Sequence, residues 1–343
     1  MKQRWQIALG ILVSIFFLWL TVPKLGLGTV AVYLRQAHYW WIVPGVVVYF
    51  GAVWARTWRW HYLLRSVKSI SLRELFPVVC IGYFGNNVYP ARAGELIRAF
   101  VLRRNNNVPI GASLATIIIE RVFDGLVMLL FVVFALPFVG ANNIPSVYRS
   151  AIVTFAVIFL AALAIFFWMA VDQRHVPAVY SFLADHFLPG RFRGSVDAFY
   201  ERFILGLHSL RSGRDVTMVF ATSAVIWLTE TVKYWFVLHA FGLQHQVSFV
   251  GLMLMNGIVN LATTLPSAPG YLGTFEVGAS VLAALGVGYS LAFGYTIVLH
   301  AALWFPITVL GAWYMWREGV RWRDFRSAEG TVVEKEMLSE RIG

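Results

Sequence analysis

Charged residues are scarce in this chain, and their scarcity excludes an ordinary soluble globular protein. Of its 343 residues, 13% are charged and 59% are hydrophobic, and the mean hydropathy is +0.68. Soluble domains carry about 25% charged residues. A β-barrel would need short segments in which apolar and polar residues alternate, whereas the apolar runs here are continuous. The composition therefore predicts an all-α, polytopic membrane protein.

Cysteine is almost absent, because Cys80 is the single one in the chain. An intramolecular disulfide is excluded, and the apolar surroundings of Cys80 favour packing over redox chemistry. Enzyme signatures are lacking too: the chain has no P-loop, no G-x-S-x-G, no H-E-x-x-H and no Cys/His ligand set. We therefore expect no cofactor and no metal. Without a nucleotide site, any transport is expected to be passive or ion-coupled.

Long apolar runs predict six helices that cross the membrane, since a helix needs roughly 20 residues to span the hydrocarbon core. The runs cover residues 5–22, 41–60, 110–139, 150–171, 216–241 and 291–316. The first run resembles a signal peptide, but no small-residue cleavage site follows it, so we expect a retained anchor. The whole of residues 1–326 is predicted to form one membrane domain, followed by a polar tail at residues 327–343.

The net charge of +11 does not indicate a nucleic-acid partner, because Lys and Arg lie in short loops between the apolar runs. Such loops stay on the cytoplasmic side, and the loops 140–149 and 242–248 are nearly free of these residues. Both termini are therefore predicted in the cytoplasm, and the protein in the cytoplasmic membrane. The connector 172–215 is either an amphipathic helix on the cytoplasmic surface or an ordinary linker beneath the bundle.

Two apolar segments are interrupted by proline and glycine: NNVYPARAGE at residues 86–95 and NLATTLPSAPGYLGTFE at residues 260–276. Broken backbone within hydrocarbon must line a cavity, because its N–H and C=O groups need partners. Paired interruptions in two halves indicate the binding site of a repeat-built transporter. We predict two re-entrant hairpins that enter from opposite faces, within inverted units at residues 41–139 and 216–316. The interrupting residues are Asn86, Pro90, Gly94, Pro266, Pro269, Gly270 and Gly273.

Charged residues inside the apolar runs are candidate site residues, because each costs about 2.5 to 3.5 kcal/mol at the centre of a membrane helix. Glu120 and Asp124 share one helical face, and Arg121 has the spacing to pair with Asp124. Two interpretations fit this cluster equally. It is either a neutralised network that holds the helices together or a direct contact for substrate or protons.

A second group of intramembrane charges lies in the runs 41–60 and 216–241. Glu230 and Lys233 are three residues apart and close enough to pair. Arg56 and Arg59 have similar spacing in the matching run of the other unit. Arg59 is nearer the inner end and is expected only to reach the interface. We therefore take Arg56, Glu230 and Lys233 as cavity candidates.

Each interruption places a glutamate where a helix restarts. Glu95 lies in such a first turn, with Arg92 and Arg98 close by. A helix start with nearby arginines is an anion site, where a phosphate headgroup would meet backbone N–H groups and Arg92. The alternative is that Arg92 reaches Glu120, Asp124 or surface phosphates.

The second interruption follows the same pattern on the other unit. Thr274 is predicted as an N-cap with Glu276 in the first turn, and a capping role alone is the alternative to substrate contact. His300, in the following run, occupies a place roughly equivalent to that of Glu120. It is either a group that titrates near neutrality or a packing residue.

At these residues the chain resembles the integral membrane domain of lysylphosphatidylglycerol synthases and its stand-alone flippase-like relatives. The resemblance spans about residues 8–316. It is carried by NNVYPARAGELIRAFVLRR, by the I-x-x-E-R-V-x-D-G run at residues 117–125, and by LPSAPGYLGTFE. In the fused synthases this domain is held to move aminoacylated phospholipid between leaflets, while a separate soluble domain makes it. That soluble domain is not found here, so the resemblance implies translocation or an accessory role.

We therefore expect a translocase that flips an anionic or modified lipid between the leaflets, with membrane phospholipid or glycolipid as its partner. The lipid would pass two half-cavities that open to opposite leaflets. One alternative is a membrane-embedded lipid-modifying enzyme, in which Glu120, Asp124 or His300 acts as general base. Another is a non-catalytic partner of a lipid-synthesising enzyme. The residues expected to line the path are Arg56, Arg92, Glu95, Arg98, Glu120, Arg121, Asp124, Glu230, Lys233, Glu276 and His300.

Overall fold

The computed structural model describes residues 26–89, 93–140, 212–264 and 269–319, with Leu210 and scattered positions between residues 154 and 200. All the elements with described bounds are helical, as the composition predicted. Those of the first half are α2 (Leu27–Gln36), η2 (Tyr39–Trp41), α3 (Ile42–Leu64), α4 (Leu72–Val88), α5 (Gly94–Asn106) and α6 (Ile110–Gly140). Those of the second half are α10 (Gly213–Ala240), α11 (Phe249–Ala262), η4 (Pro269–Tyr271), α12 (Val277–Ala284) and α13 (Tyr289–Arg317).

Three of the described helices, α6, α10 and α13, are long and apolar enough to cross a membrane. They coincide, within a few residues, with the predicted runs 110–139, 216–241 and 291–316. The predicted run 41–60 corresponds to α3, a helix of 23 residues. The short helix α2 was not predicted. The runs 5–22 and 150–171, the connector 172–215 and the tail 327–343 fall largely or wholly outside the described residues.

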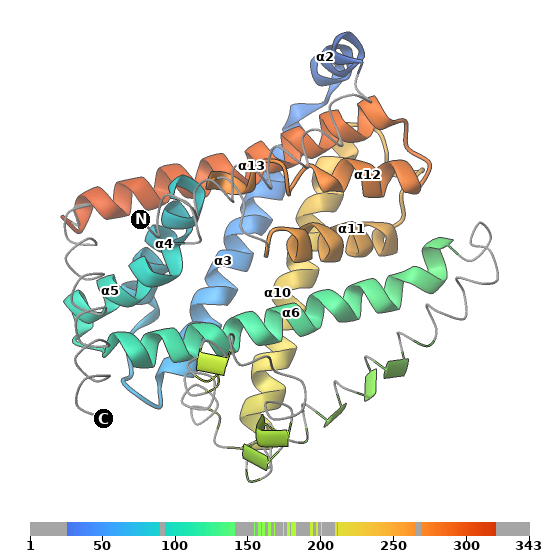
Figure 1. Cartoon of the computed structure of the whole chain (residues 1–343). Coiled ribbons are helices and arrows are strands. Elements are labelled where there is room, and N and C mark those ends of the chain that lie inside the picture. Colours follow the sequence, from blue (N-terminus) through green and yellow to red (C-terminus); the bar gives the residue numbers. More distant parts are fainter. Residues whose placement is uncertain are drawn as a thin grey trace.

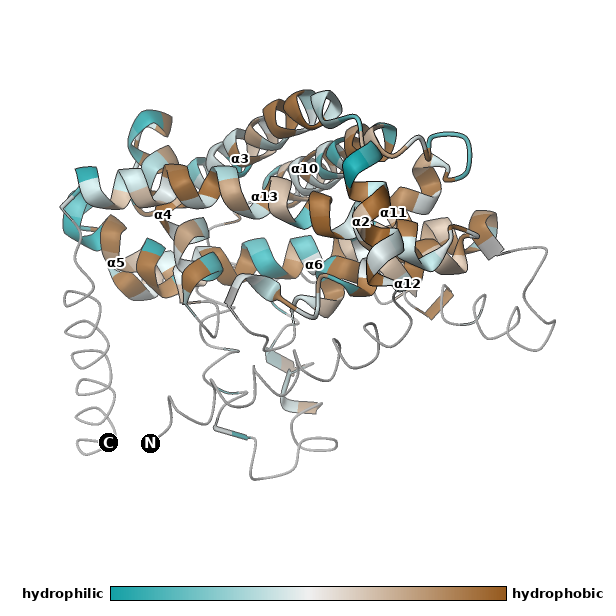
Figure 2. Ribbon diagram, turned by 90° about the horizontal axis from the view of Figure 1, so that it is seen from above, coloured by the Kyte–Doolittle hydropathy of each residue, from teal (hydrophilic) through white to brown (hydrophobic). Residues whose placement is uncertain are grey.

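Large apolar side chains are exposed on the long helices, while charged side chains of the same helices are buried. Phe138 on α6 and Phe305 on α13 are 68% and 62% exposed, whereas Arg59 and Glu120 are each 1% exposed. Figure 2 shows hydrophobic residues along much of the helices and a hydrophilic stretch partway along α6. Exposed apolar surface on this scale needs a cover, and lipid provides it for a protein that buries its charges.

The helices of the two predicted units pack on one another in a reciprocal pattern. The first helices, α3 and α10, lie side by side, and α13 and α6 cross this pair in Figure 1. The interrupted segment of each unit then packs on the last helix of the other unit. Thus α4 lies on α13, and α11 lies on α6.

Glycine allows α4 and α5 to approach closely at the first interruption. A Cβ atom on Gly94 would lie 1.9 Å from the carbonyl oxygen of Gly82, and one on Gly85 would lie 2.7 Å from the Cα of Gly94. The side-chain oxygen of Asn86 accepts a hydrogen bond from the Gly94 N–H at 2.9 Å. Asn86 thereby satisfies an amide at the start of α5 that has no partner within the helix. Pro90 and Arg92 lie outside the described residues.

The second interruption is a turn between α11 and α12. Gly270 and Gly273 have φ angles of +69° and +87°, which favour glycine. Pro269 begins η4, and Pro266 lies outside the described residues. The membrane faces from which the two interrupted segments enter stay a prediction.

The predicted N-cap at Thr274 is wrong, because α12 begins at Val277 and Glu276 occupies the N-cap position. The Thr274 hydroxyl instead donates to the carbonyl oxygen of Tyr271 at 3.0 Å. Glu276 turns back and accepts a hydrogen bond from the Gly273 N–H at 2.6 Å. This bond closes the turn ahead of the helix, and so the helix starts later than the sequence pattern indicated.

Candidate functional site: a charged cavity between the two units

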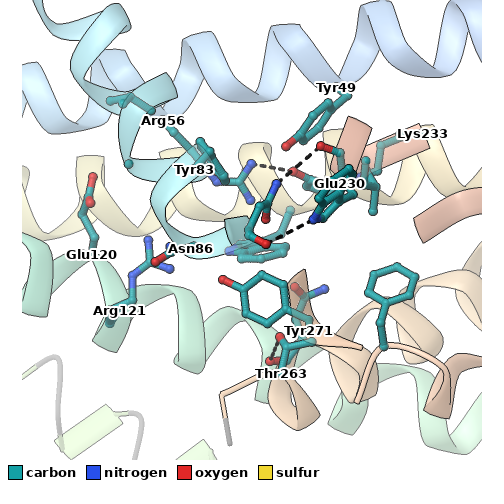
Figure 3. Close-up of a pocket in the computed structure, with 18 of the residues that line it drawn as sticks. Tyr49, Arg56, Tyr83, Asn86, Glu120, Arg121, Glu230, Lys233, Thr263 and Tyr271 are labelled. Carbon is teal, nitrogen blue, oxygen red and sulfur yellow. Dashed lines mark hydrogen bonds and ion pairs between the residues drawn. The ribbon is translucent and has the colours of Figure 1, made fainter. Parts of the chain in front are cut away.

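A cavity of about 160 Å³ lies between the two units and has room for several water molecules. Helices α3 to α6 supply one side, and α10, α11, α13 and the turn at η4 supply the other. Figure 3 shows Arg56, Glu120 and Lys233 among its lining residues, each on a different helix. The predicted residues that line it are Arg56, Glu95, Arg98, Glu120, Arg121, Glu230, Lys233 and His300.

These charges of both units share one cavity, where the sequence predicted two half-cavities. The prediction assigned each hairpin its own half-cavity, but the reciprocal packing brings the charged helices of both units together. Two more predicted residues, Asp124 and Glu276, lie behind the wall and bind lining residues. Arg92 falls outside the described residues.

Asp124 is the centre of the first ion-pair network. Arg59 donates to both of its oxygens, with distances of 2.6 and 3.1 Å, and the indole N–H of Trp227 donates to Oδ1 at 2.8 Å. The predicted pair with Arg121 is confirmed, with 3.3 Å between Nη2 and Oδ2. The expectation for Arg59 was wrong, because it does not reach the interface. It is buried and also donates to Ser223 at 2.6 Å.

Glu120 joins the same network one helical turn away. It accepts a hydrogen bond from Arg98 at 3.1 Å, and the Nε of Arg59 is 3.8 Å from its other oxygen. The Arg98 guanidinium lies over the Trp60 ring, 4.0 Å from the ring centre. A Cβ on Gly82 would be 2.3 Å from the Arg98 side chain. The absence of a side chain at Gly82 therefore gives Arg98 its path to Glu120.

The second network contains two cations and one carboxylate. Arg56 donates to Oε1 of Glu230 at 2.5 Å, and Lys233 donates to Oε2. The Lys233 ammonium also lies 4.6 Å from the centre of the Tyr49 ring, and the Arg56 guanidinium 4.8 Å from that of Trp227. The predicted Glu230–Lys233 pair is confirmed. Because Glu230 balances only one of the two cations, the network has a net charge of +1.

Several hydrogen-bond donors around the cavity have no partner among the described residues. The buried carboxylates Asp124, Glu120 and Glu230 each lie within ion-pair distance of two cations. The Nε–H groups of Arg59, Arg98 and Arg121, by contrast, are buried without a hydrogen-bond partner among the described residues.

Two tyrosines add further unpaired hydroxyl groups. Tyr49 and Tyr83 line the cavity, and their hydroxyl groups make no hydrogen bond to any residue in the described ranges. Arg59, Arg98 and Arg121 are balanced by Glu95, Glu120 and Asp124, so the excess positive charge of these two networks lies at Arg56, Glu230 and Lys233. Such a site is suited to an anion that brings its own oxygen acceptors.

His300 reaches the cavity from α13 and contacts the turn between α11 and α12. Its Nδ1 is 3.0 Å from Oε1 of Glu276, and its Nε2 is 2.7 Å from the carbonyl oxygen of Gly270. The imidazole stacks on the Phe275 ring, with 4.4 Å between the ring centres. His300 therefore contacts the turn that shapes this side of the cavity.

Sequence reasoning missed most of the uncharged lining, and it also missed Arg59. Helical spacing from a recognised charge was an available signal, because residues three, four or seven apart share a face. Tyr49 lies seven residues before Arg56, and Trp227 lies three before Glu230. The missed lining residues are Tyr49, Arg59, Val79, Gly82, Tyr83, Asn87, Trp227, Tyr234, Asn260, Thr263, Tyr271, Phe275, Leu303 and Trp304.

Comparison with known proteins identifies the family of this chain. Residues 7–311 match the model of a family described as the lysylphosphatidylglycerol synthase TM region. The chain belongs to this family. The segment that matches the lysylphosphatidylglycerol synthase TM region family contains all the residues that line the cavity and both interruptions. No solved structure matches the chain.

Several curated proteins are similar to this family member. A UPF0104 membrane protein of Methanothermobacter thermautotrophicus is 26% identical over 91% of this chain and 92% of the relative. A UPF0104 membrane protein of Pyrococcus horikoshii is 24% identical, with 91% and 96% covered. The glycosyltransferase AglD of Haloferax volcanii is 27% identical over 90% of this chain, which spans only 54% of that relative.

Proposed function

We propose that this chain moves an anionic lipid between the leaflets of the cytoplasmic membrane, with the headgroup passing through the charged cavity. The observation that carries the proposal is the set of cations and unpaired donors around the cavity. The buried carboxylates are already bound, whereas three guanidinium Nε–H groups and two tyrosine hydroxyls are not. A phosphate offers acceptors to the tyrosine hydroxyls and to the cations that line the cavity.

The position of the excess charge supports the same proposal. Arg56 and Lys233 share the single carboxylate of Glu230, and both side chains are buried. An unbalanced cation in a medium of low dielectric is costly, and an arriving anion reduces that cost. A singly charged phosphodiester headgroup balances this network.

The packing of the two units supports movement between leaflets. A twofold relation between the units requires α4 to lie on α13 as α11 lies on α6, which is the pattern found. Transporters built from inverted repeats hold their substrate between the repeats and expose it alternately to the two sides. The cavity lies in the corresponding place, with lining residues from both units.

A second candidate is a role beside a lipid-synthesising enzyme. It is favoured by the relative AglD, which is named a glycosyltransferase and of which this chain spans 54%. The lipid-modifying enzyme is less well supported. A general base needs a lone pair that faces the substrate. Glu120 and Asp124 are each paired with two cations, and His300 is bonded at both ring nitrogens.

Leaflet exchange of headgroup-labelled phosphatidylglycerol in proteoliposomes tests the proposal. We expect exchange well above that of empty liposomes. Lys233→Gln should slow it by about tenfold or more, because a hydrogen bond to a charged group is worth about 1.5 to 3 kcal/mol. Arg65→Gln is the control, since Arg65 pairs with Asp215 away from the cavity. Wild-type exchange equal to that of empty liposomes would refute the proposal.

A further inference from the structure

The two ring nitrogens of His300 both face oxygen atoms, although a neutral imidazole has only one N–H. The Nε2 lies 2.7 Å from the carbonyl oxygen of Gly270, and the Nδ1 lies 3.0 Å from Oε1 of Glu276. Both His300 and Glu276 are buried. Each short contact requires a proton between its two heavy atoms.

The geometry fixes the number of protons in this group. A carbonyl oxygen only accepts, so Nε2 carries a proton. A second proton lies between Nδ1 and Oε1, either on a histidinium beside an ionised glutamate or on a neutral carboxyl group beside a neutral imidazole. Both arrangements have zero net charge. Loss of one proton to water leaves a net charge of −1 and turns one hydrogen bond into a contact between two lone pairs.

Those two hydrogen bonds hold the turn at residues 270–276 against α13. The other oxygen of Glu276 accepts from Gly273 within the turn, and the Phe275 ring stacks on His300. Gly270 packs so closely on α13 that a Cβ there would lie 2.7 Å from the indole nitrogen of Trp304. Tyr271 and Phe275 of this turn line the cavity. Loss of a proton from the pair of His300 and Glu276 therefore changes how firmly this part of the cavity wall is held.

We propose that His300 and Glu276 form a proton-binding site that couples one proton to each lipid moved. The inference rests on the proposed function. With the second proton bound, the turn is held on α13, and release of that proton loosens it. A phosphate in the cavity favours the state that carries the extra positive charge, so lipid and proton bind together. One proton with one singly charged lipid moves no net charge.

Other ionisable groups that share this cavity set the local field. They come from α3, α4, α5, α6, α10 and η4, and Glu276 itself precedes α12. An anion beside the cations offsets their repulsion of the extra proton, which fixes the direction of the coupling. These groups are Tyr49, Arg56, Arg59, Tyr83, Glu95, Arg98, Glu120, Arg121, Glu230, Lys233, Tyr234 and Tyr271.

Glu276→Gln removes the releasable proton but keeps the hydrogen bonds that hold the turn. The glutamine N–H can donate to Nδ1, its carbonyl can accept from Gly273, and the bond from Nε2 to Gly270 remains. The variant thus keeps all three hydrogen bonds and imitates the state with both protons, but has no second proton to release. Glu318→Gln is the matched control, because Glu318 follows α13 and does not line the cavity.

The test is the leaflet distribution of labelled phosphatidylglycerol under a pH gradient of one unit, with the membrane potential held at zero by potassium and valinomycin. One coupled proton predicts an equilibrium ratio of about tenfold between leaflets for the wild type and Glu318→Gln. This ratio does not depend on how the protein is oriented. Glu276→Gln should exchange lipid with a ratio of one. A wild type that exchanges lipid with a ratio of one overturns the coupling but leaves the proposed function standing, and a Glu276→Gln that follows the gradient also overturns it.

Hydrogen exchange gives a readout that does not depend on lipid movement. After correction for the intrinsic effect of pH, the amides of residues 270–276 should lose protection as pH rises in the wild type. In Glu276→Gln their protection should be independent of pH. Protection that does not change with pH in the wild type would overturn the proton site, even if the chain moves no lipid.

Discussion

Replacing Asp124 with asparagine removes a charge that holds three helices together. Arg59 on α3 binds both of its oxygens, Trp227 on α10 donates to one, and Arg121 lies 3.3 Å away. Breaking a buried ion pair from one side costs about 3 to 5 kcal/mol, because the other charge stays buried. Asparagine keeps one oxygen acceptor, and Glu120 lies 3.8 Å from Arg59. We therefore expect a loss at the low end, about 3 kcal/mol.

The single cysteine makes this loss measurable in detergent. Cys80 is fully buried and reacts with a thiol-reactive dye only when the protein unfolds, so the dye reports the unfolding temperature without an engineered cysteine. At about 2 °C per kcal/mol for a chain of this size, Asp124→Asn should lower Tm by about 6 °C. Arg59→Gln combined with Asp124→Asn removes both charges and should recover about 2 kcal/mol relative to the sum of the single losses. In the control Arg65→Gln, the altered side chain is 44% exposed and its partner Asp215 keeps hydrogen bonds from Tyr62 and Ser212, so the cost should be less than about 1 kcal/mol.

Two results would refute this reasoning. A Tm for Asp124→Asn within 1 °C of the wild type, on the scale of about 2 °C per kcal/mol, would mean that Arg59 finds equal stabilisation elsewhere. Losses in the double variant that equal the sum of the two single losses would mean that Arg59 and Asp124 are not coupled.

Three further variants test other parts of the structure. Gly94→Ala should destabilise by more than about 1 kcal/mol, because its Cβ would meet the Gly82 carbonyl oxygen, whereas Gly111→Ala, with nothing within 4 Å, should be neutral or stabilising by dye-detected Tm. Arg59→Lys should also lower Tm, since an ammonium lacks the fork that binds both oxygens of the carboxylate. Tyr83→Phe should leave Tm unchanged but slow phosphatidylglycerol exchange about fivefold, the equivalent of one hydrogen bond of about 1 kcal/mol; unchanged exchange would remove Tyr83 from the headgroup path.

The local ion pairs could be predicted from the sequence because helical spacing determines them. Arg121 and Asp124, and likewise Glu230 and Lys233, lie three residues apart on one helix, and both pairs form. The long apolar helices were predicted for the same kind of reason, since their hydropathy is a property of consecutive residues. The cost of burying charge also indicated correctly that these residues would face the interior.

Long-range partners could not be predicted in this way. Arg59 binds Asp124, 65 residues away, because α3 and α6 meet in the folded chain. The position of Arg59 within its own apolar run indicated only that it lies near the inner end of that run. The N-cap at Thr274 failed for a similar reason, since residue type does not show that Glu276 turns back to Gly273. The sharing of one cavity by both units follows from the reciprocal packing of α4 and α11, which one sequence does not specify.

The decisive measurement is the headgroup selectivity of leaflet exchange, with labelled phosphatidylglycerol and phosphatidylcholine compared in the same proteoliposomes. We predict that the wild type exchanges the anionic lipid at least about tenfold faster, since its phosphate meets unpaired donors without a compensating choline cation. Lys233→Gln should bring the two rates close together. Equal rates in the wild type, or exchange of neither lipid above that in empty liposomes, would contradict recognition of an anionic headgroup in this cavity.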